Sequence, residues 1–527
     1  MELSLFGFSV SWPLVIALVV IILGRDWWYR SYFKRKGIPS PPTMPFLGNF
    51  LDIAKGMHIC FPEFTKKYGK VYGFFMFNKP IYVVSDPEMV REIGVKSFSN
   101  FTNHEMFVLK NRPLDKGLSM LQDQHWKDVR NIITPTFSAA KMKKMSGLIN
   151  ECCDYLVKNL GARQQKDNEV NVNSVFEAFT MDGIARCAFG LEIDSQNNPN
   201  DPFVAYAKTI VNGSIVNPRL IIAGVLPPVA HLMNYFHIGM FPMGVINFFS
   251  NVVDKAMAIR EADPRSEERK DFLQLIMNAH QSGESEKVTE GKKVEEDVHS
   301  HLDEHHNMEF FESRRNKDLK LTKEEIVAQT LLFFIAGYET TNVTLGFIAY
   351  SLATNPEVQD KLIQEVDEVT PDRDSVNYSS IAKMPYLDGV VCETLRMYPP
   401  AALTDRVCNE TYTLNDVTFP KGVQIFFPIH AIHHDPEYWP NPEVFDPLRY
   451  TKENREGRHP FAWMPFGAGP RNCVGMRFAL MEIKMAVARV LQKYRFQTSP
   501  NSKVPLKFGT RNIKPEEGIV LSVVERT

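Results

Sequence analysis

The stretch Phe466–Gly475 reads FGAGPRNCVG and holds one cysteine among three glycines, near the end of a chain of 527 residues. Such a cysteine can be half of a disulfide, a catalytic nucleophile or a metal ligand. No histidine lies nearby to act as the base that a nucleophile needs, although a distant one stays open. The next run, MRFALMEIKMAVARVLQKY, has a helical pattern, so Cys473 lies at a helix N-terminus. Backbone N–H groups there favour a thiolate, which suits a metal-bound sulfur.

The composition excludes several classes of protein. Hydrophobic residues make up 44% of the chain, as expected for a globular protein with a large core. The formal net charge is −2, and no zinc-finger or basic-zipper spacing occurs, so no nucleic-acid partner is expected. The 7 cysteines are odd in number and form no CxxC pair, which argues for reduced thiols in a body that faces the cytosol.

The first 24 residues differ from the rest. No charge occurs from Leu3 to Gly24, and as a helix this run is long enough to span ~30 Å of hydrocarbon. A cleaved signal peptide is the alternative, but no basic segment precedes the run and no small-residue cleavage site follows it. The basic residues come after the run instead. Residues 1–24 are therefore predicted to be a retained transmembrane anchor with the body on the cytosolic side.

Residues 25–50 are basic and rich in proline, and they contain KGIPSPPTMPFLGN. Because proline fixes φ and resists helix, the stretch Lys36–Asn49 is predicted to be a stiff, extended linker, with a turn-rich spacer as the alternative. The remaining residues, 51–527, form the folded body.

The body is predicted to be mainly α-helical. Thr322 and Glu325 form a capping box, and the run behind them is apolar on nearly all sides, as in a helix through a large core. A second helix is expected over 385–397. Strand-like runs occur at 71–77, 80–85, 422–430 and 518–524, without βαβ alternation. The fold class is therefore mainly α with small β-sheets (α+β).

Two segments stand apart from this pattern. Residues 283–320 are charged and rich in histidine, and His301 and His305 have the spacing of two metal ligands on a helix. A solvated loop is the favoured interpretation. Residues 220–249 are apolar but broken by prolines, so they are either core or a second surface that dips into a membrane.

The cysteine stretch resembles the haem-binding signature of the cytochrome P-450 family, F-x-x-G-x-R-x-C-x-G. The matching residues are Phe466, Gly469, Arg471, Cys473 and Gly475. The resemblance implies the cytochrome P-450 fold, haem b as cofactor and the Cys473 thiolate as the axial iron ligand. It also implies that Phe466 packs near the haem and that Gly469 makes the turn beneath it. Gly475 would let the following helix start close to the haem, and Arg471 would bind a propionate. Residues 51–527 would then be the haem-thiolate catalytic domain.

Two further motifs strengthen this resemblance. Trp126 and Arg130 match the W-x-x-x-R pattern that contacts a haem propionate in the family, and Arg406 matches another propionate-binding arginine. A planar guanidinium suits this task because it can bind a carboxylate through two N–H groups.

Glu393 and Arg396 resemble the E-x-x-R pair of the family, and Arg449 matches the arginine that joins that pair. Spacing i, i+3 places the first two side chains on one helix face. Leu448 replaces the usual glutamate of the arginine's segment, and Tyr450 replaces the usual phenylalanine. The implied role is structural, namely to hold the haem-cysteine loop.

The stretch AGYETT, Ala336–Thr341, resembles the oxygen-activation motif of the family. Gly337 is expected to permit a distortion of the helix and close approach of oxygen. Glu339 and Thr340 are expected to deliver protons as an acid–alcohol pair. Without the cysteine motif, the same residues would indicate only a kink with a satisfied polar patch.

The resemblance covers essentially the whole chain and is nearest to the drug- and steroid-oxidising microsomal branch of vertebrates. It implies a monooxygenase in the endoplasmic reticulum membrane that inserts one atom of O2 into a lipophilic steroid, fatty acid or xenobiotic. Electrons would come from NADPH through a separate reductase, with cytochrome b5 as a further candidate donor, because no flavin or nicotinamide fingerprint occurs. An isomerase of hydroperoxides or endoperoxides and a non-catalytic haem protein are the alternatives. Pocket positions that match this branch are Ser119, Ile335, Ala336, Ala401 and Leu403.

Overall fold

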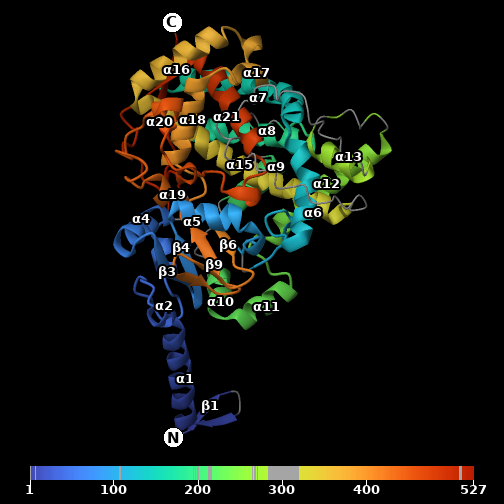
Figure 1. The fold of residues 1–527 in the computed structure, drawn as a ribbon. Coiled ribbons are helices and arrows are strands. Elements are labelled where there is room, and N and C mark those ends of the chain that lie inside the picture. Colours follow the sequence, from blue (N-terminus) through green and yellow to red (C-terminus); the bar gives the residue numbers. More distant parts are fainter. Residues whose placement is uncertain are drawn as a thin grey trace.

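A computed structural model describes the chain except residues 1, 6–7, 106–108, 194, 196–197, 199–200, 212–216, 264, 266–268, 270, 283–319, 510–512 and 527. Helices dominate, and the described strands form four small sheets, which confirms the predicted fold class. Figure 1 shows helix α1 (Trp12–Arg30) projecting from one end of the body, with the larger sheet between it and most of the helices. The predicted histidine-rich loop falls almost entirely outside the described residues.

The helices follow the chain in this order. They are α1, α2 (Tyr32–Arg35), α3 (Phe50–Ala54), α4 (Met57–Tyr68), α5 (Pro87–Arg91), α6 (Asp123–Ile133), α7 (Ala139–Lys166), α8 (Val172–Ile184), α9 (Pro202–Val211), α10 (Pro218–Val225), α11 (Pro227–Tyr235), α12 (Met243–Ala262), α13 (Phe272–Ser282), α15 (Lys323–Thr354), α16 (Pro356–Val369), α17 (Tyr378–Ile381), α18 (Pro385–Met397), α19 (Ile429–His433), α20 (Lys452–Arg455) and α21 (Met476–Leu491).

The sheets contain all four strands that the sequence predicts. The largest has the order β3 (Val71–Met76), β4 (Lys79–Val84), β9 (Gln424–Phe427) and β6 (Thr404–Val407). Another has the order β10 (Tyr494–Gln497), β11 (Val520–Glu525) and β5 (Glu169–Asn171). The two hairpins are β1 (Glu2–Leu5) with β2 (Phe8–Ser11) and β7 (Tyr412–Leu414) with β8 (Val417–Phe419).

Helix α15 runs through the middle of the helical body and forms much of its core (Figure 1). The predicted capping box is present, because the Thr322 side chain accepts from the Glu325 backbone and the Glu325 side chain accepts from the Thr322 backbone. The helix is continuous through Gly337, where a distortion was expected. A Cβ at this position would lie 2.7 Å from Cδ1 of Ile184, so the glycine instead permits close packing of α15 on α8.

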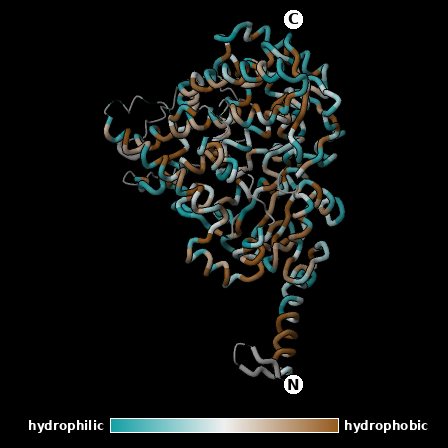
Figure 2. The backbone as a smooth tube through the Cα atoms, turned by 180° about the vertical axis from the view of Figure 1, so that it is seen from behind, coloured by the Kyte–Doolittle hydropathy of each residue, from teal (hydrophilic) through white to brown (hydrophobic). Residues whose placement is uncertain are grey.

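The amino-terminal helix differs from the prediction at both ends. Helix α1 begins at Trp12 rather than Leu3, with Pro13 in its first turn, where the missing N–H of proline costs nothing. It continues to Arg30. Both α1 and α15 are long and apolar enough to cross a membrane. Only 6% of the most apolar stretch of α1 is buried, compared with 61% of that of α15. Figure 2 shows α1 as a hydrophobic rod outside the body, whereas α15 is a core helix.

The segment 25–50 is packed against the body rather than extended away from it. Phe33 of α2 is fully buried, and its ring lies directly over Gly73 of β3. The Gly73 N–H donates to Pro39 O at 2.8 Å. Asp26 is also buried, and it accepts from Arg30 Nε at 2.6 Å and from the Phe46 N–H at 2.9 Å.

The apolar segment 220–249 divides into an exposed part and a part that belongs to the core. Helices α10 and α11 and the residues after them leave Leu226, Tyr235 and Phe236 exposed by 50%, 77% and 62%. Val245 and Phe249 of α12 are instead buried in the main core. Figure 1 shows α10 and α11 at the same end of the body as α1.

Candidate active site

The cysteine loop lies between a 3-10 turn at Gly469–Arg471 and helix α21. The Cys473 N–H donates to Phe466 O at 2.8 Å and closes the loop. Gly469 has φ +68°, and a Cβ there would collide with the carbonyl oxygen of Gly94, so only glycine fits this turn. The sequence prediction of a glycine turn at this position is therefore confirmed.

Cys473 differs from the other six cysteines. All seven are free thiols in the described part of the chain, and Cys473 alone is solvent-accessible. Burial nevertheless raises the pKa of its thiol, against the opposing effects of the Gly475 N–H and the Arg130 charge. Cys473 is thus exposed and at the same time desolvated by the protein around it, which indicates that it faces an internal space rather than the outer surface. The helix N-terminus therefore does not by itself make a thiolate here, and a bound metal ion would.

Three buried arginines surround this loop. Arg130 of α6 donates to Asn472 O at 3.0 Å and Asn472 Oδ1 at 2.7 Å. Arg406 of β6 donates to Ala468 O at 2.7 Å. Arg471 donates to the carbonyl oxygens of Thr102, Leu118 and Leu121, and its guanidinium lies 3.9 Å from the ring centroid of Trp126. The structure thus brings together at one loop the arginines that the sequence motifs predict.

The three arginines are suited to hold an anionic group, because without one their buried positive charges are poorly balanced. Burial lowers the pKa of Arg130 and Arg406 to about 10, and burial together with the two neighbouring cations lowers that of Arg471 to about 9. The buried Nε atoms of Arg130 and Arg406 have no hydrogen-bond partner among the described residues. Asp405 is a nearby buried carboxylate. A group that brings two carboxylates, as haem does through its propionates, would supply the missing negative charge.

Helix α15 supplies a polar wall. Ala336 and Thr340 are exposed although they lie within a core helix, and their i, i+4 spacing places them on one face. The Thr340 hydroxyl donates to Ala336 O at 2.7 Å. Glu339 lies one residue earlier and forms an ion pair in which its Oε1 is 2.7 Å from Lys514 Nζ. Phe333 connects this helix to the cysteine loop, because its ring would lie 3.9 Å from a Cβ at Gly475.

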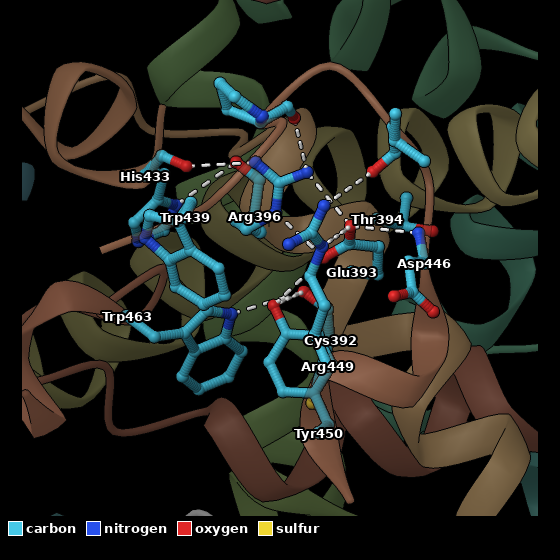
Figure 3. A network of polar contacts seen from close by, with 12 residues as sticks. Cys392, Glu393, Thr394, Arg396, His433, Trp439, Asp446, Arg449, Tyr450 and Trp463 are labelled. Carbon is cyan, nitrogen blue, oxygen red and sulfur yellow. Dashed lines mark hydrogen bonds and ion pairs between the residues drawn. The ribbon is translucent and has the colours of Figure 1, made fainter. Parts of the chain in front are cut away.

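Glu393 is the centre of a buried polar network (Figure 3). Its Oε2 accepts from Arg396 Nε at 2.8 Å, and its Oε1 accepts from Arg396 Nη2 at 2.9 Å and from Arg449 Nε at 3.1 Å. The backbone N–H of Asp446 and the hydroxyl of Tyr450 donate to it as well, at 3.1 and 3.3 Å. Glu393 and Arg396 are fully buried, so the three predicted residues form one charged cluster with its hydrogen bonds satisfied.

The network reaches the cysteine loop through His433. Arg396 Nη1 donates to His433 O at 3.0 Å, and His433 Nε2 accepts from the Met464 N–H at 2.9 Å. Met464 lies two residues before Phe466. Burial holds the pKa of His433 well below its usual value, so the ring is neutral and can act as this acceptor.

Comparison with known proteins agrees with this arrangement. A model of the family described as cytochrome P-450 matches residues 38–297 and 292–523. The chain belongs to the cytochrome P-450 family.

Relatives extend the match to the full chain. Cytochrome P-450 3A6 of Oryctolagus cuniculus is 38% identical over 518 residues, which cover 98% of this chain and 97% of the relative. Cytochrome P-450 3A29 of Sus scrofa is 36% identical over 527 residues, with 99% and 98% covered. Cytochrome P-450 3A56 of Fundulus heteroclitus is 35% identical over 519 residues, with 98% of each covered. The chain is a cytochrome P-450 monooxygenase, and this family holds haem through a cysteine thiolate.

The expected substrate contacts of this cytochrome P-450 lie in two environments. Ala336 and Ala401 are exposed, and Ser119 is half-buried. Ile335 packs against the main core, and Leu403 packs against the cluster beneath β3 and β9. No contact among the described residues joins all five positions, so their role as one pocket stays a prediction.

Sequence reasoning missed three ionisable residues at the cytochrome P-450 site. His104 Nδ1 lies 2.9 Å from Asp405 Oδ1, and its Nε2 lies 3.5 Å from Arg406 Nη1. Lys514 pairs with Glu339 from the carboxyl-terminal segment. Asp405 could have been suspected from its place beside Arg406. His104 and Lys514 carry no local signal, because only the fold brings them to the site.

Proposed function

We propose that this monooxygenase inserts one atom of O2 into a lipophilic small molecule, a steroid, a fatty acid or a xenobiotic. The observation that carries the proposal is Cys473, which is exposed although its loop is surrounded by buried arginines. Two electrons would come from NADPH through a separate flavoprotein reductase, with cytochrome b5 as a further candidate donor. The mainly helical architecture supports this, because it contains no nucleotide-binding βαβ unit among the described residues.

Haem b fits the residues present. Cys473 would bind the iron, and Arg130, Arg406 and Arg471 would hold the propionates, with Trp126 beneath Arg471. Phe466, Gly469 and Gly475 would lie against the macrocycle. When bound, the haem supplies the redox chemistry that activates O2, and the thiolate promotes cleavage of the O–O bond.

The chain's own residues then bind, orient and supply protons. The Thr340 hydroxyl is the proton donor on the cavity side of α15, where its neighbour Ala336 leaves room for substrate. Glu339 is the acid that restores the proton of Thr340. The cluster of Glu393, Arg396 and Arg449 holds the cysteine loop in place through His433 and Met464.

The proposed location is the endoplasmic reticulum membrane, with the catalytic domain facing the cytosol. Helix α1 is the single anchor, and the exposed apolar residues of α10 and α11 form a second contact with lipid. Their position at the end of the body that carries α1 supports this arrangement (Figure 1). Removing residues 1–24 is then expected to weaken membrane binding without abolishing it.

The test of the iron ligand is Cys473→Ala. The reduced carbon-monoxide complex of the wild type is expected to show the red-shifted Soret band that a thiolate trans to carbon monoxide produces, and the variant is expected to lose it. Cys152→Ala, which removes a buried cysteine of α7, is the control and should keep the band. A variant at Cys473 that retained the band would refute the ligand assignment.

A second experiment tests the reaction. With reductase and a lipophilic substrate, NADPH consumption should accompany hydroxylated product. Product from an endoperoxide without NADPH would favour the isomerase alternative instead. Absence of turnover across a broad panel of lipophilic substrates would favour the non-catalytic alternative.

A further inference from the structure

Glu339 makes an ion pair that the motif around it does not predict. Its Oε1 is 2.7 Å from Nζ of Lys514, whereas its Oε2 is buried and makes no hydrogen bond among the described residues. The Glu339 side chain is 18% exposed and that of Lys514 is 43% exposed. One oxygen of the carboxylate is therefore held at the solvent side, and the other lies inside the protein without a partner.

Lys514 is held at this place by the fold. The Gly509 N–H donates to Lys514 O at 2.8 Å, and the flanking residues Ile513 and Pro515 are buried. Phe508, which pairs with Pro515, is 5.9 Å from the ring centroids of both Phe347 and Tyr398. Phe347 belongs to α15, so the carboxyl-terminal segment is packed on the same helix that carries Glu339.

The ion pair lies on a different face of α15 from Thr340. Consecutive residues of an α-helix are turned by about 100° from each other. Thr340 is exposed, and Glu339 points toward the carboxyl-terminal segment. Without a fixed partner, the Glu339 side chain could adopt several rotamers, and its unpaired inner oxygen would gain by turning toward another donor.

We propose that Lys514 is a positioning residue for proton delivery: its ammonium group holds Glu339 with one oxygen at the solvent boundary and the other directed inward. This rests on the proposed role of Glu339 and Thr340 as the proton-delivering pair. In this arrangement Glu339 keeps one orientation between turnovers and can receive a proton from the side of Lys514. Loss of the cation leaves the acid present but misplaced, so oxygen is reduced to peroxide instead of being transferred to substrate.

The test compares variants of the full-length enzyme with haem and reductase. Lys514→Gln removes the cation, Lys514→Arg retains it, and Lys507→Met removes an exposed lysine of the same segment as the matched control. The ratio of peroxide to NADPH consumed is expected to rise about two- to five-fold in Lys514→Gln, as suits a partly exposed ion pair. It should stay near the wild-type ratio in Lys514→Arg and Lys507→Met.

Two readouts distinguish positioning from a merely structural role. High salt should raise the peroxide ratio of the wild type toward that of Lys514→Gln, and it should have little effect on Lys514→Gln itself. A double-mutant cycle with Glu339→Gln, read by the midpoint of urea unfolding, should be non-additive because the two side chains interact.

The outcomes separate the two proposals. If Glu339→Gln raises the peroxide ratio but Lys514→Gln does not, the inference about Lys514 fails and the role of Glu339 stands. If Glu339→Gln keeps the wild-type ratio of peroxide to NADPH, the proposed role of Glu339 fails and the inference fails with it. A Lys514→Gln effect that Lys514→Arg does not rescue, with an additive cycle, would assign the effect to packing of the segment and also overturn the inference.

Discussion

Two buried clusters of charge are connected to the cysteine loop, and they are built differently. At Glu393, one carboxylate receives donors from Arg396, Arg449, Tyr450 and the Asp446 backbone, so the chain satisfies its own charges. At the other cluster, the arginines outnumber the nearby carboxylates, and two of their Nε atoms lack partners among the described residues. The first cluster is complete as a piece of protein, whereas the second requires an anionic group from outside.

A third buried group, Glu482, shows why the unbalanced arginines indicate a bound anion. This carboxyl is fully buried between α21, α8 and α15, with Thr341 as the polar side chain that faces it. Burial raises its pKa to about 8, against the favourable effect of Thr341 on the ionised form. A carboxyl without a cation can become neutral by taking a proton. The three arginines stay charged at neutral pH even with lowered pKa values, so only an anion can balance them.

The largest effect is expected from breaking the complete cluster. Arg396→Met leaves Glu393 with an uncompensated part of its charge in the core, which should cost about 3–5 kcal/mol of unfolding free energy. The measurement is the denaturant midpoint, together with the yield of folded, haem-containing protein.

Tyr450→Phe is the matched control for this prediction. It removes a hydroxyl donor to Glu393 but no charge, so it should cost about 1–2 kcal/mol. Equal losses in the two variants would contradict the view that the charge of Arg396 is what the cluster depends on.

The next largest effect is expected at the Glu482 carboxyl, in the pH dependence of the unfolding free energy. The pKa of Glu482 is about 8 in the folded chain, above its value in the unfolded chain, so the folded state binds more protons between about pH 4.5 and 8. Stability should therefore fall as pH rises through this window, by on the order of a few kcal/mol. Glu482→Gln should remove this part of the slope, as measured by denaturant midpoints at several pH values.

The control for the pH prediction is Glu525→Gln, an exposed carboxyl of β11. It should leave the slope unchanged. An unchanged slope in Glu482→Gln would mean that its carboxyl ionises in the folded protein as readily as in the unfolded chain.

The smallest effect is expected at the incomplete cluster. Arg406→Met removes one of the proposed propionate partners, so haem should dissociate about tenfold faster, as measured by transfer to a haem acceptor. The stability of the haem-free protein should change by less than about 1 kcal/mol, because the burial cost of this cation offsets its hydrogen bonds to the carbonyl oxygens of Asp405 and Ala468. The opposite result, lower stability with unchanged haem affinity, would make Arg406 a structural residue like Arg396.

Short-range patterns predicted the main features well. The capping box at Thr322, the four strand runs and the glycine turn at Gly469 are each encoded by a few neighbouring residues, and each is present. The family resemblance then placed Glu393, Arg396 and Arg449 in one cluster, although Arg449 is 56 residues from Glu393 in the sequence.

The features that sequence missed depend on packing between distant segments. Lys514 reaches Glu339 only because Phe508 packs on α15, and His104 reaches Asp405 across 301 residues. Gly337 looked like the site of a helix distortion, but the space it leaves is filled by Ile184 of α8. The extent of α1 was also misjudged, since hydropathy alone does not show that Asp26 and Arg30 continue the helix into the body.

The docking of residues 25–50 decides where the chain can be shortened. Phe33 fills the face of the larger sheet, with its ring centroid 5.1 Å from that of Phe75 and 5.2 Å from that of Tyr82. A truncated protein that begins at Asp26 keeps the packing of Phe33 on the sheet and the ion pair between Asp26 and Arg30. One that begins at Lys36 exposes the sheet beneath and loses packing comparable to a core phenylalanine, about 3–5 kcal/mol. The exposed part of α1 can be removed, but Asp26 and the residues after it belong to the fold of the enzyme.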